Sequence, residues 1–289
     1  SSVPGPTWPN RFFVHAATSG GFIDNNIHPY DMRTIHQNLA GRGLSWKIYF
    51  HDIPQALALA NLRSSPGNFA LYEEVFARDC ADGTLPNYAF IEPRYFDFLW
   101  LKANDQHPPH GVVPGELLLA DVYEAIRRSP LWERCALIVL WDEHGGIYDH
   151  VLPPSAANPD GKVAAEFDFT RLGLRVPAVV VSPYVRRGWV DSRIYDHSSV
   201  PAFLKRLFDL PDYLTKRDAA ANTFEGVFAL DTPRQDAPTV VQRPSPTAPG
   251  PMQPAGAARR PGAVTPEAVL AAKSAGQAST LPLTDLQKS

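Results

Sequence analysis

The sequence predicts an α/β fold in which a mostly parallel central sheet is covered by helices on both faces. The chain has 289 residues, of which 44% are hydrophobic, so it is long enough to bury a core of ordinary size. Short apolar runs of strand length alternate along it with segments of helical periodicity. This alternation is typical of parallel strands joined by crossover helices.

Five apolar runs have the length and the β-branched or aromatic content of buried strands. They are residues 11–15, 46–50, 88–91, 136–141 and 176–181.

Two segments between and after these runs show helical periodicity. In residues 115–128, Leu118, Val122 and Ile126 share one face. In residues 198–208, Val200, Phe203 and Leu207 do the same. Both segments are therefore expected to cover the sheet with their apolar faces.

The composition changes near residue 232, which sets the expected domain boundary. No aromatic residue follows Phe228, and proline, alanine, glutamine and serine dominate the rest. Such a segment buries too little apolar area to offset its ordering entropy. We expect a catalytic domain at 1–231 and a largely disordered, Pro/Ala-rich tail at 232–289, with a short helix at 266–275.

Charge and hydropathy exclude several classes of partner. The net charge is −3, so no basic field favours nucleic acid, and no stretch approaches the ~20 apolar residues of a membrane span. Motifs of zincins, serine hydrolases and nucleotide enzymes are absent from the sequence. The oligomeric state and the compartment stay open, between secreted or periplasmic and cytosolic or peripheral to a membrane.

The strongest chemical signal follows the apolar run at 136–141. Asp142 and Glu143 come where this strand ends, and the HGG and YDH segments bring His144 and His150. Sites in parallel α/β sheets lie beyond the carboxyl ends of strands, and two adjacent carboxylates repel unless a cation lies between them. A divalent cation bound through oxygen is the predicted reason for the pair; a solvated Asp-Glu cap is the alternative.

Three further segments carry weaker signals. The NDQHPPH segment at 104–110 holds Asp105 and the proline-framed His107, which could bind a phosphate oxygen or protonate a leaving group. His197 lies before the second helix, where a capping segment explains it equally well. Thr7, with Asn10 nearby, is expected just before the strand at 11–15, as a nucleophile or as a turn residue.

Taken together, these segments resemble the phosphoesterase family that contains plant and bacterial non-specific phospholipases C and a bacterial acid phosphatase branch. The resemblance runs through most of residues 1–226 in the family's order. It is carried by GPTWPNRFFVHAATSGG, LPNYAFIEPRYFD, NDQHPPH, SPLWERCALIVLWDEHGGIYDHV, FDFTRLGLRVPAVVVSPYV, DHSSVPA and YLTKRDAAANTFE.

The resemblance implies an alkaline-phosphatase-like fold and a metal-dependent site. It implies Thr7 as nucleophile and metal ligand, Asp142 and Glu143 as metal ligands, and His107 as a catalytic contact to phosphate. The cation would be Ca, Mg, Mn or Zn. The family's early Glu-Asn pair, near the end of its first strand, is absent here. We therefore expect the first strand to be missing and the sequence to be N-terminally truncated.

The implied activity is that of a phospholipase C acting on glycerophospholipids at a membrane surface through a phosphothreonine intermediate. Two alternatives stay open. One is an acid phosphatase on soluble monoesters, and the other is a non-catalytic lipid- or phosphate-binding relic. Besides Asn10 and Asp105, the residues His144, His150 and His197 are candidates for substrate contact.

Overall fold

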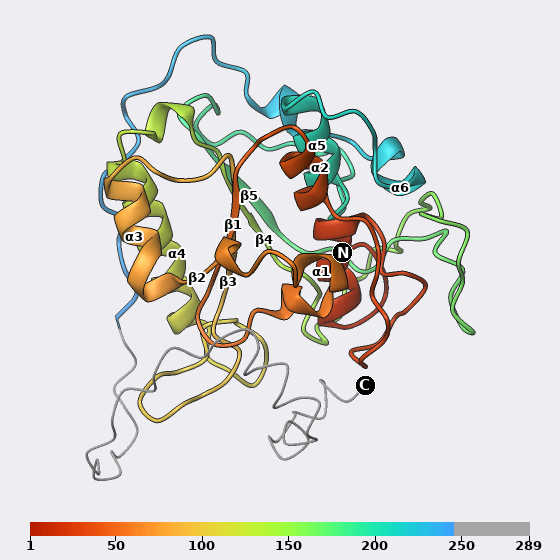
Figure 1. Ribbon diagram of the computed structural model, residues 1–289. Helices are drawn as coiled ribbons and strands as arrows, with labels where there is room; N and C mark the ends of the chain where they lie inside the picture. The colour runs from red at the N-terminus through yellow and green to blue at the C-terminus, as the bar shows by residue number, and fades with distance from the viewer. Residues whose placement is uncertain (246–289) are drawn as a thin grey trace.

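The computed structural model describes residues 1–245. Strand β1 (Trp46–Phe50) lies between β2 (Phe69–Leu71) and β3 (Tyr88–Glu92), and pairs in parallel with both (Figure 1). Strand β4 (Leu137–Leu140) forms a separate antiparallel pair with β5 (Ala178–Val181). Four of the five predicted strands are therefore present, and the antiparallel direction of β5 departs from the parallel expectation.

The two sheets belong to one layer, because their side chains alternate between the same two cores. Ile48 and Tyr49 are neighbours on β1, and the first packs into one apolar cluster while the second packs into the other. On β4, Ile138 contacts the first cluster and Leu137 the second. This period of two is what a strand buried on both faces requires.

Helices cover both faces of this layer, as the sequence predicts. Helices α1 (Thr7–Ala16), α2 (Ile35–Gly41) and α5 (Ser199–Leu207) supply the cluster on one face, and α3 (Tyr72–Ala81) and α4 (Val113–Arg128) supply the other. A short α6 (Lys216–Ala220) follows α5. The five 3₁₀ turns are η1 (Gln55–Ala58), η2 (Ala60–Leu62), η3 (Pro66–Asn68), η4 (Trp132–Arg134) and η5 (Phe224–Val227).

The prediction of a strand at residues 11–15 is wrong, because these residues lie in α1. Phe12 packs into the first cluster and Phe13 into a separate one, so the helix is apolar on two sides. A short apolar run cannot be assigned to strand or helix by periodicity alone. Pro9 lies in the first turn of α1, where backbone N–H groups have no partner within the helix and proline is tolerated.

A cavity of about 900 Å³ separates β3 from β4. Its walls are formed by both strands, by the apolar faces of α4 and α5, and by Phe228. Its polar end is lined by Arg11, Asp142 and His197. Within residues 1–245, neither β3 nor β4 has a strand paired to the edge that faces this cavity.

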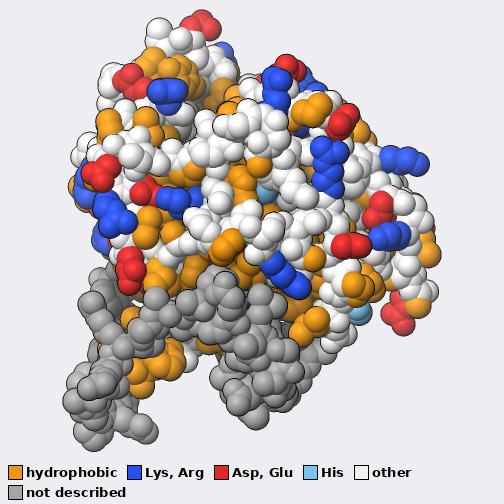
Figure 2. Space-filling model, viewed as in Figure 1, with side chains coloured by type: hydrophobic (Ala, Val, Ile, Leu, Met, Phe, Trp, Pro, Cys, Tyr) orange, Lys and Arg blue, Asp and Glu red, His pale blue; other side chains and the backbone are white. Residues whose placement is uncertain are grey.

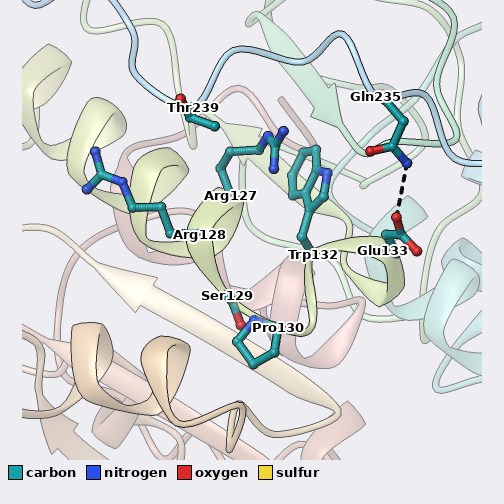
Figure 3. Close-up of a pocket in the computed structure, with 8 residues that line it drawn as sticks. All are labelled: Arg127, Arg128, Ser129, Pro130, Trp132, Glu133, Gln235 and Thr239. Carbon is teal, nitrogen blue, oxygen red and sulfur yellow. Dashed lines mark hydrogen bonds between the residues drawn. The ribbon is translucent and has the colours of Figure 1, made fainter.

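Residues 232–245 lie along α4 and η4 (Figure 3). Gln235 donates a hydrogen bond to Glu133 over 3.1 Å, and Arg243 forms ion pairs with Asp121 and Glu124 at 2.7 and 3.1 Å. The first part of the expected tail therefore contacts the domain. The expectations for 246–289, including the short helix at 266–275, fall outside the described residues.

No helix within residues 1–245 combines the length and the apolar character needed to cross a bilayer.

Candidate active site

Arg11 joins the carboxyl ends of β3 and β4. Its Nε donates to Asp142 Oδ2 over 2.8 Å, and its Nη1 lies 3.9 Å from Glu92 Oε2. Arg11 also donates to the hydroxyl of Tyr95 and lies over that ring, 4.7 Å from its centroid. The last residue of β3 and a residue just beyond β4 thus meet at one guanidinium, so the two strands end at the same edge of the layer.

Burial and the Arg11 charge oppose one another at these two carboxyl groups. Burial raises the pKa of Glu92 to about 7, although Arg11 and the backbone N–H groups of Gln55 and Ala56 favour its ionised form. Burial also disfavours the charged form of Asp142, but Arg11 outweighs it and lowers the pKa of that carboxyl. Asp142 is therefore ionised at neutral pH, and Glu92 titrates near it.

His107 and Glu143 form the second pair of the site. His107 Nε2 lies 3.2 Å from Glu143 Oε1, and His107 Nδ1 lies 2.6 Å from the carbonyl oxygen of Pro108. The hydrogen bond to Glu143 raises the pKa of His107 to about 8, so the imidazole is a cation at neutral pH and both ring nitrogens donate. The structure thus brings together two residues that the sequence predicts separately.

The glycines after Glu143 let the chain turn back against the His107 loop. Gly145 and Gly146 have φ angles of 61° and 75°, in the left-handed region that favours glycine. A Cβ on Gly145 would lie 3.0 Å from Pro108. The Gly145 N–H donates to Glu143 Oε2 over 2.6 Å, which fixes the carboxylate that faces His107.

Thr7 is the first residue of α1, one helical turn before Arg11. Residues four apart lie on the same face of a helix, so Thr7 and the arginine that binds Asp142 share that face. The N-terminus of a helix also carries partial positive charge, which favours a bound anion, although in α1 the Trp8 N–H donates to Asn25 over 2.9 Å and Pro9 has no N–H. Thr7, at the start of α1, and the guanidinium of Arg11 therefore lie on the same side of the helix.

The side chains of two predicted substrate contacts, Asn10 and Asp105, make hydrogen bonds within the chain. The Asn10 side chain is fully buried; its oxygen accepts from the N–H groups of Ser2 and Val3, and its nitrogen donates to the carbonyls of Val3, Gly5 and Pro6. Asp105 accepts from the His107 N–H over 3.3 Å and from His110 Nδ1 over 2.8 Å. Asn10 shapes the turn before Thr7, and Asp105 shapes the His107 loop.

The three remaining predicted histidines differ in how they lie relative to Asp142 and Glu143. His197 lines the cavity beside Asp142, but its ring nitrogens are held by the Trp141 carbonyl at 3.0 Å and by Ser2 Oγ at 3.1 Å. Burial lowers the pKa of His197 to about 4, so it is neutral. His144 Nδ1 lies 3.3 Å from Glu143, at the site. His150 is 80% exposed and its neighbour Asp149 is bound by Arg175.

The described residues supply only part of a cation site. Within residues 1–245, no three His, Cys, Asp or Glu side chains converge where a metal ion could lie. Asp142 faces Arg11, and the two oxygens of Glu143 face His107 and His144. Two carboxylates give fewer oxygens than the six to eight of Ca²⁺ or the six of Mg²⁺. Further ligands are needed for these residues to hold the predicted cation.

Sequence reasoning missed Arg11, Glu92 and Tyr95. Arg11 was hidden because residues 11–15 look like a strand, and only a helix places it one turn after Thr7. Glu92 did carry a signal, since it directly follows the predicted strand at 88–91. Binding sites in α/β proteins lie beyond the carboxyl ends of such strands.

Carboxylates, an arginine and a cationic histidine meet at the carboxyl ends of the strands, where α/β proteins bind their ligands. The two cations suit this site to an anionic ligand. The chain belongs to the Phosphoesterase family, whose model matches residues 1–211.

Relatives of known name match most of this chain. It is 42% identical over 260 residues to non-specific phospholipase C3 of Arabidopsis thaliana, covering 83% of this chain and 50% of that protein. It is 44% identical over 267 residues to non-specific phospholipase C6 of the same plant, covering 85% and 51%. Phospholipase C B of Mycobacterium tuberculosis is 28% identical over 277 residues, covering 80% and 52%. The chain spans about half the length of these relatives.

Proposed function

We propose that this chain is the catalytic part of a phospholipase C-type phosphoric diester hydrolase. It would cleave glycerophospholipids into diacylglycerol and a phosphorylated head group. The names of the relatives and the membership of the Phosphoesterase family support this reaction class.

The observation that carries the proposal is the presence of two cations, Arg11 and His107, beside the carboxylates of Asp142 and Glu143. Arg11 and His107 are anchored by Asp142 and Glu143 at 2.8 and 3.2 Å. A phosphodiester carries one negative charge, and preorganised donors stabilise the further charge that develops on its oxygens during displacement. Thr7 is half-buried and is the first residue of α1, the helix that carries Arg11.

The proposed reaction uses Thr7 as the nucleophile. Its Oγ attacks phosphorus in line with the glycerol oxygen and releases its proton to solvent, while the bond from phosphorus to the glycerol oxygen breaks. His107 binds a non-bridging oxygen or gives its proton to the departing diacylglycerol oxygen. Water then attacks the phosphothreonine, which releases the phosphorylated head group and restores the Thr7 hydroxyl.

We propose that a divalent cation joins Asp142, Glu143 and the Thr7 hydroxyl once further ligands are present. When bound, such an ion lowers the pKa of a hydroxyl and neutralises phosphoryl charge. The cavity between β3 and β4 suits a further strand, because both facing edges carry backbone groups without a sheet partner among residues 1–245. A strand that runs parallel to β3 would bring its carboxyl end to Asp142.

Turnover on two substrates tests the proposal. We expect diacylglycerol release from phosphatidylcholine vesicles to exceed phosphate release from a small aryl phosphate. The reverse result would identify an acid phosphatase on soluble monoesters, because a monoester needs no room for a diacyl group. Absence of turnover on both, together with no tightly bound cation by elemental analysis even when the further ligands are supplied, would identify a non-catalytic binding relic.

A further inference from the structure

Four large apolar residues protrude in succession from the segment that follows β3. Phe98, Leu99, Trp100 and Leu101 are 49%, 55%, 61% and 39% exposed. Figure 1 places the segment after β3 at the bottom of the view, and in Figure 2 some hydrophobic side chains are visible at the lower margin of the coloured surface. Single exposed apolar residues are ordinary, but a contiguous group marks a contact surface. We call residues 97–102 the apolar loop.

The apolar loop is a closed turn in which the two residues that flank its tip pair with each other. Phe98 and Leu101 exchange two backbone hydrogen bonds of 2.9 Å each, and Leu99 has a φ of 54° in the left-handed region. At its base, Asp97 binds Lys102 at 2.6 Å and accepts from the Ala103 N–H at 2.8 Å. The pairing of Phe98 with Leu101 lowers the cost of bringing the loop to an apolar phase, where unpaired backbone groups are costly.

The base of the apolar loop is fastened directly to the active site. The Asn104 N–H donates to the Arg94 carbonyl over 2.9 Å, and the Asn104 side-chain oxygen accepts from the Arg94 N–H. Tyr95, which directly follows Arg94 on the stem that leads from β3 to the loop, contacts both Arg11 and Glu92. On the other side of the stem, Asp105 leads to His107. The two stems of the loop therefore continue into residues that build the site.

We propose that the apolar loop inserts into a phospholipid surface and holds the active site at the head groups. This inference rests on the proposed phospholipase function, since the diacylglycerol product stays in the bilayer and the site must reach its surface. Trp100 is of the type enriched at membrane interfaces. Arg94 and Lys102, at the base, remain at head-group level while the tip lies deeper.

The charge of the chain favours a bilayer of zwitterionic lipid as the partner. A net charge of −3 gives no general attraction to anionic lipid. The driving force is then the burial of apolar side chains at the tip. The loop is also convex and short, with its charged residues confined to the base, which suits shallow insertion between head groups.

Vesicle partitioning of the full chain tests the loop. The variant Leu99→Ser with Trp100→Ser should bind phosphatidylcholine vesicles roughly tenfold or more weakly in a sedimentation assay, because it loses two large apolar groups from the bilayer. The control, Val190→Ser with Ile194→Ser, removes two comparably exposed apolar residues (80% and 57%) from another loop and should bind like the parent. Equal melting temperatures would show that all three proteins are folded.

Hydrolysis separates the loop from the chemistry. The loop variant should lose turnover on vesicles but keep it on a short-chain phosphatidylcholine dissolved below its micelle concentration. The proposal is overturned if the parent does not bind vesicles, or if the loop variant binds them as tightly as the parent. It is also overturned if the control pair loses binding as the loop variant is expected to. If the parent binds through the loop but releases no diacylglycerol even when the further cation ligands are supplied, the phospholipase proposal fails and the membrane contact stands.

Discussion

Arg11 Nε lies 2.8 Å from Asp142 Oδ2, so helix α1 is tied to the chain just beyond β4 by a charge-assisted hydrogen bond. The two side chains are only 14% and 24% exposed. The same guanidinium reaches Glu92, whose side chain is 1% exposed. One cation therefore balances two shielded carboxyl groups.

Replacing Arg11 with Met should cost about 3 kcal/mol of unfolding free energy at pH 8, since it leaves buried carboxylates uncompensated. The loss should shrink at pH 5.5, because Glu92, with a pKa of about 7 that rises further without Arg11, is then protonated. Urea unfolding at both pH values measures this. Arg42→Met, at the exposed Arg42–Asp209 pair, is the control and should change stability by less than about 0.5 kcal/mol. An equal loss at both pH values would contradict the electrostatic explanation.

Replacing Thr7 with Ala should lower turnover by several orders of magnitude, under conditions where the parent is active, and leave the melting temperature almost unchanged. Thr7→Ser should keep partial activity because it retains the hydroxyl. Thr215→Ala is the matched control: Thr215 caps α6 by accepting from the Arg217 N–H over 3.0 Å. Its loss should cost about 1 kcal/mol of stability and spare the rate. Near-parent turnover in Thr7→Ala would exclude covalent catalysis through Thr7.

The buried His15–His36 pair should make the fold sensitive to acid. His15 Nδ1 lies 3.2 Å from His36 Nε2, and burial lowers the pKa of His15 to about 3 and that of His36 well below its ordinary value. The unfolded chain binds these protons near pH 6.5 but the folded chain does not, so stability falls as the pH drops from 6.5 toward 3. At pH 5 the loss from His15 is on the order of 2 kcal/mol.

Unfolding of the parent and of His15→Phe with His36→Leu, at pH 7.5 and 5, isolates this effect from other titrating groups. The double variant should lose less stability than the parent between these two pH values. His150→Gln is the control, because His150 is 80% exposed and should leave the difference as in the parent. Parallel pH profiles for the parent and the double variant would refute the assignment.

A strand supplied as a peptide should enter the cavity between β3 and β4. An apolar peptide of valine and isoleucine that ends in Glu-Asn, with lysines outside for solubility, should raise the melting temperature. At 100 times its dissociation constant it would stabilise the chain by about 2.7 kcal/mol. Tight binding of a divalent cation should appear only with the peptide present. A proline in the middle of the peptide removes a ladder donor and should abolish both effects; a proline peptide that works equally well would disprove strand pairing.

Local patterns in the sequence suffice to predict the α/β class, the strands at 46–50 and 88–91, and the helices at 115–128 and 198–208. These depend on local periodicity, which the structure keeps because each element is buried on the faces that its own apolar residues define. The sequence also pointed to Asp142, Glu143 and His107, since polar residues after a buried strand or in a rigid loop carry a local signal.

Only the tertiary structure decided which of these residues meet. His107 and Glu143 are 36 positions apart, and their 3.2 Å contact depends on the turn at Gly145 closing against Pro108. The helical state of residues 11–15 was likewise decided by packing, because Phe12 and Phe13 are buried in two different clusters that a short run of sequence does not reveal. That packing is also what places Arg11 between the ends of two strands. Local patterns specify elements and candidate side chains, whereas contacts between distant segments are fixed by how the elements pack.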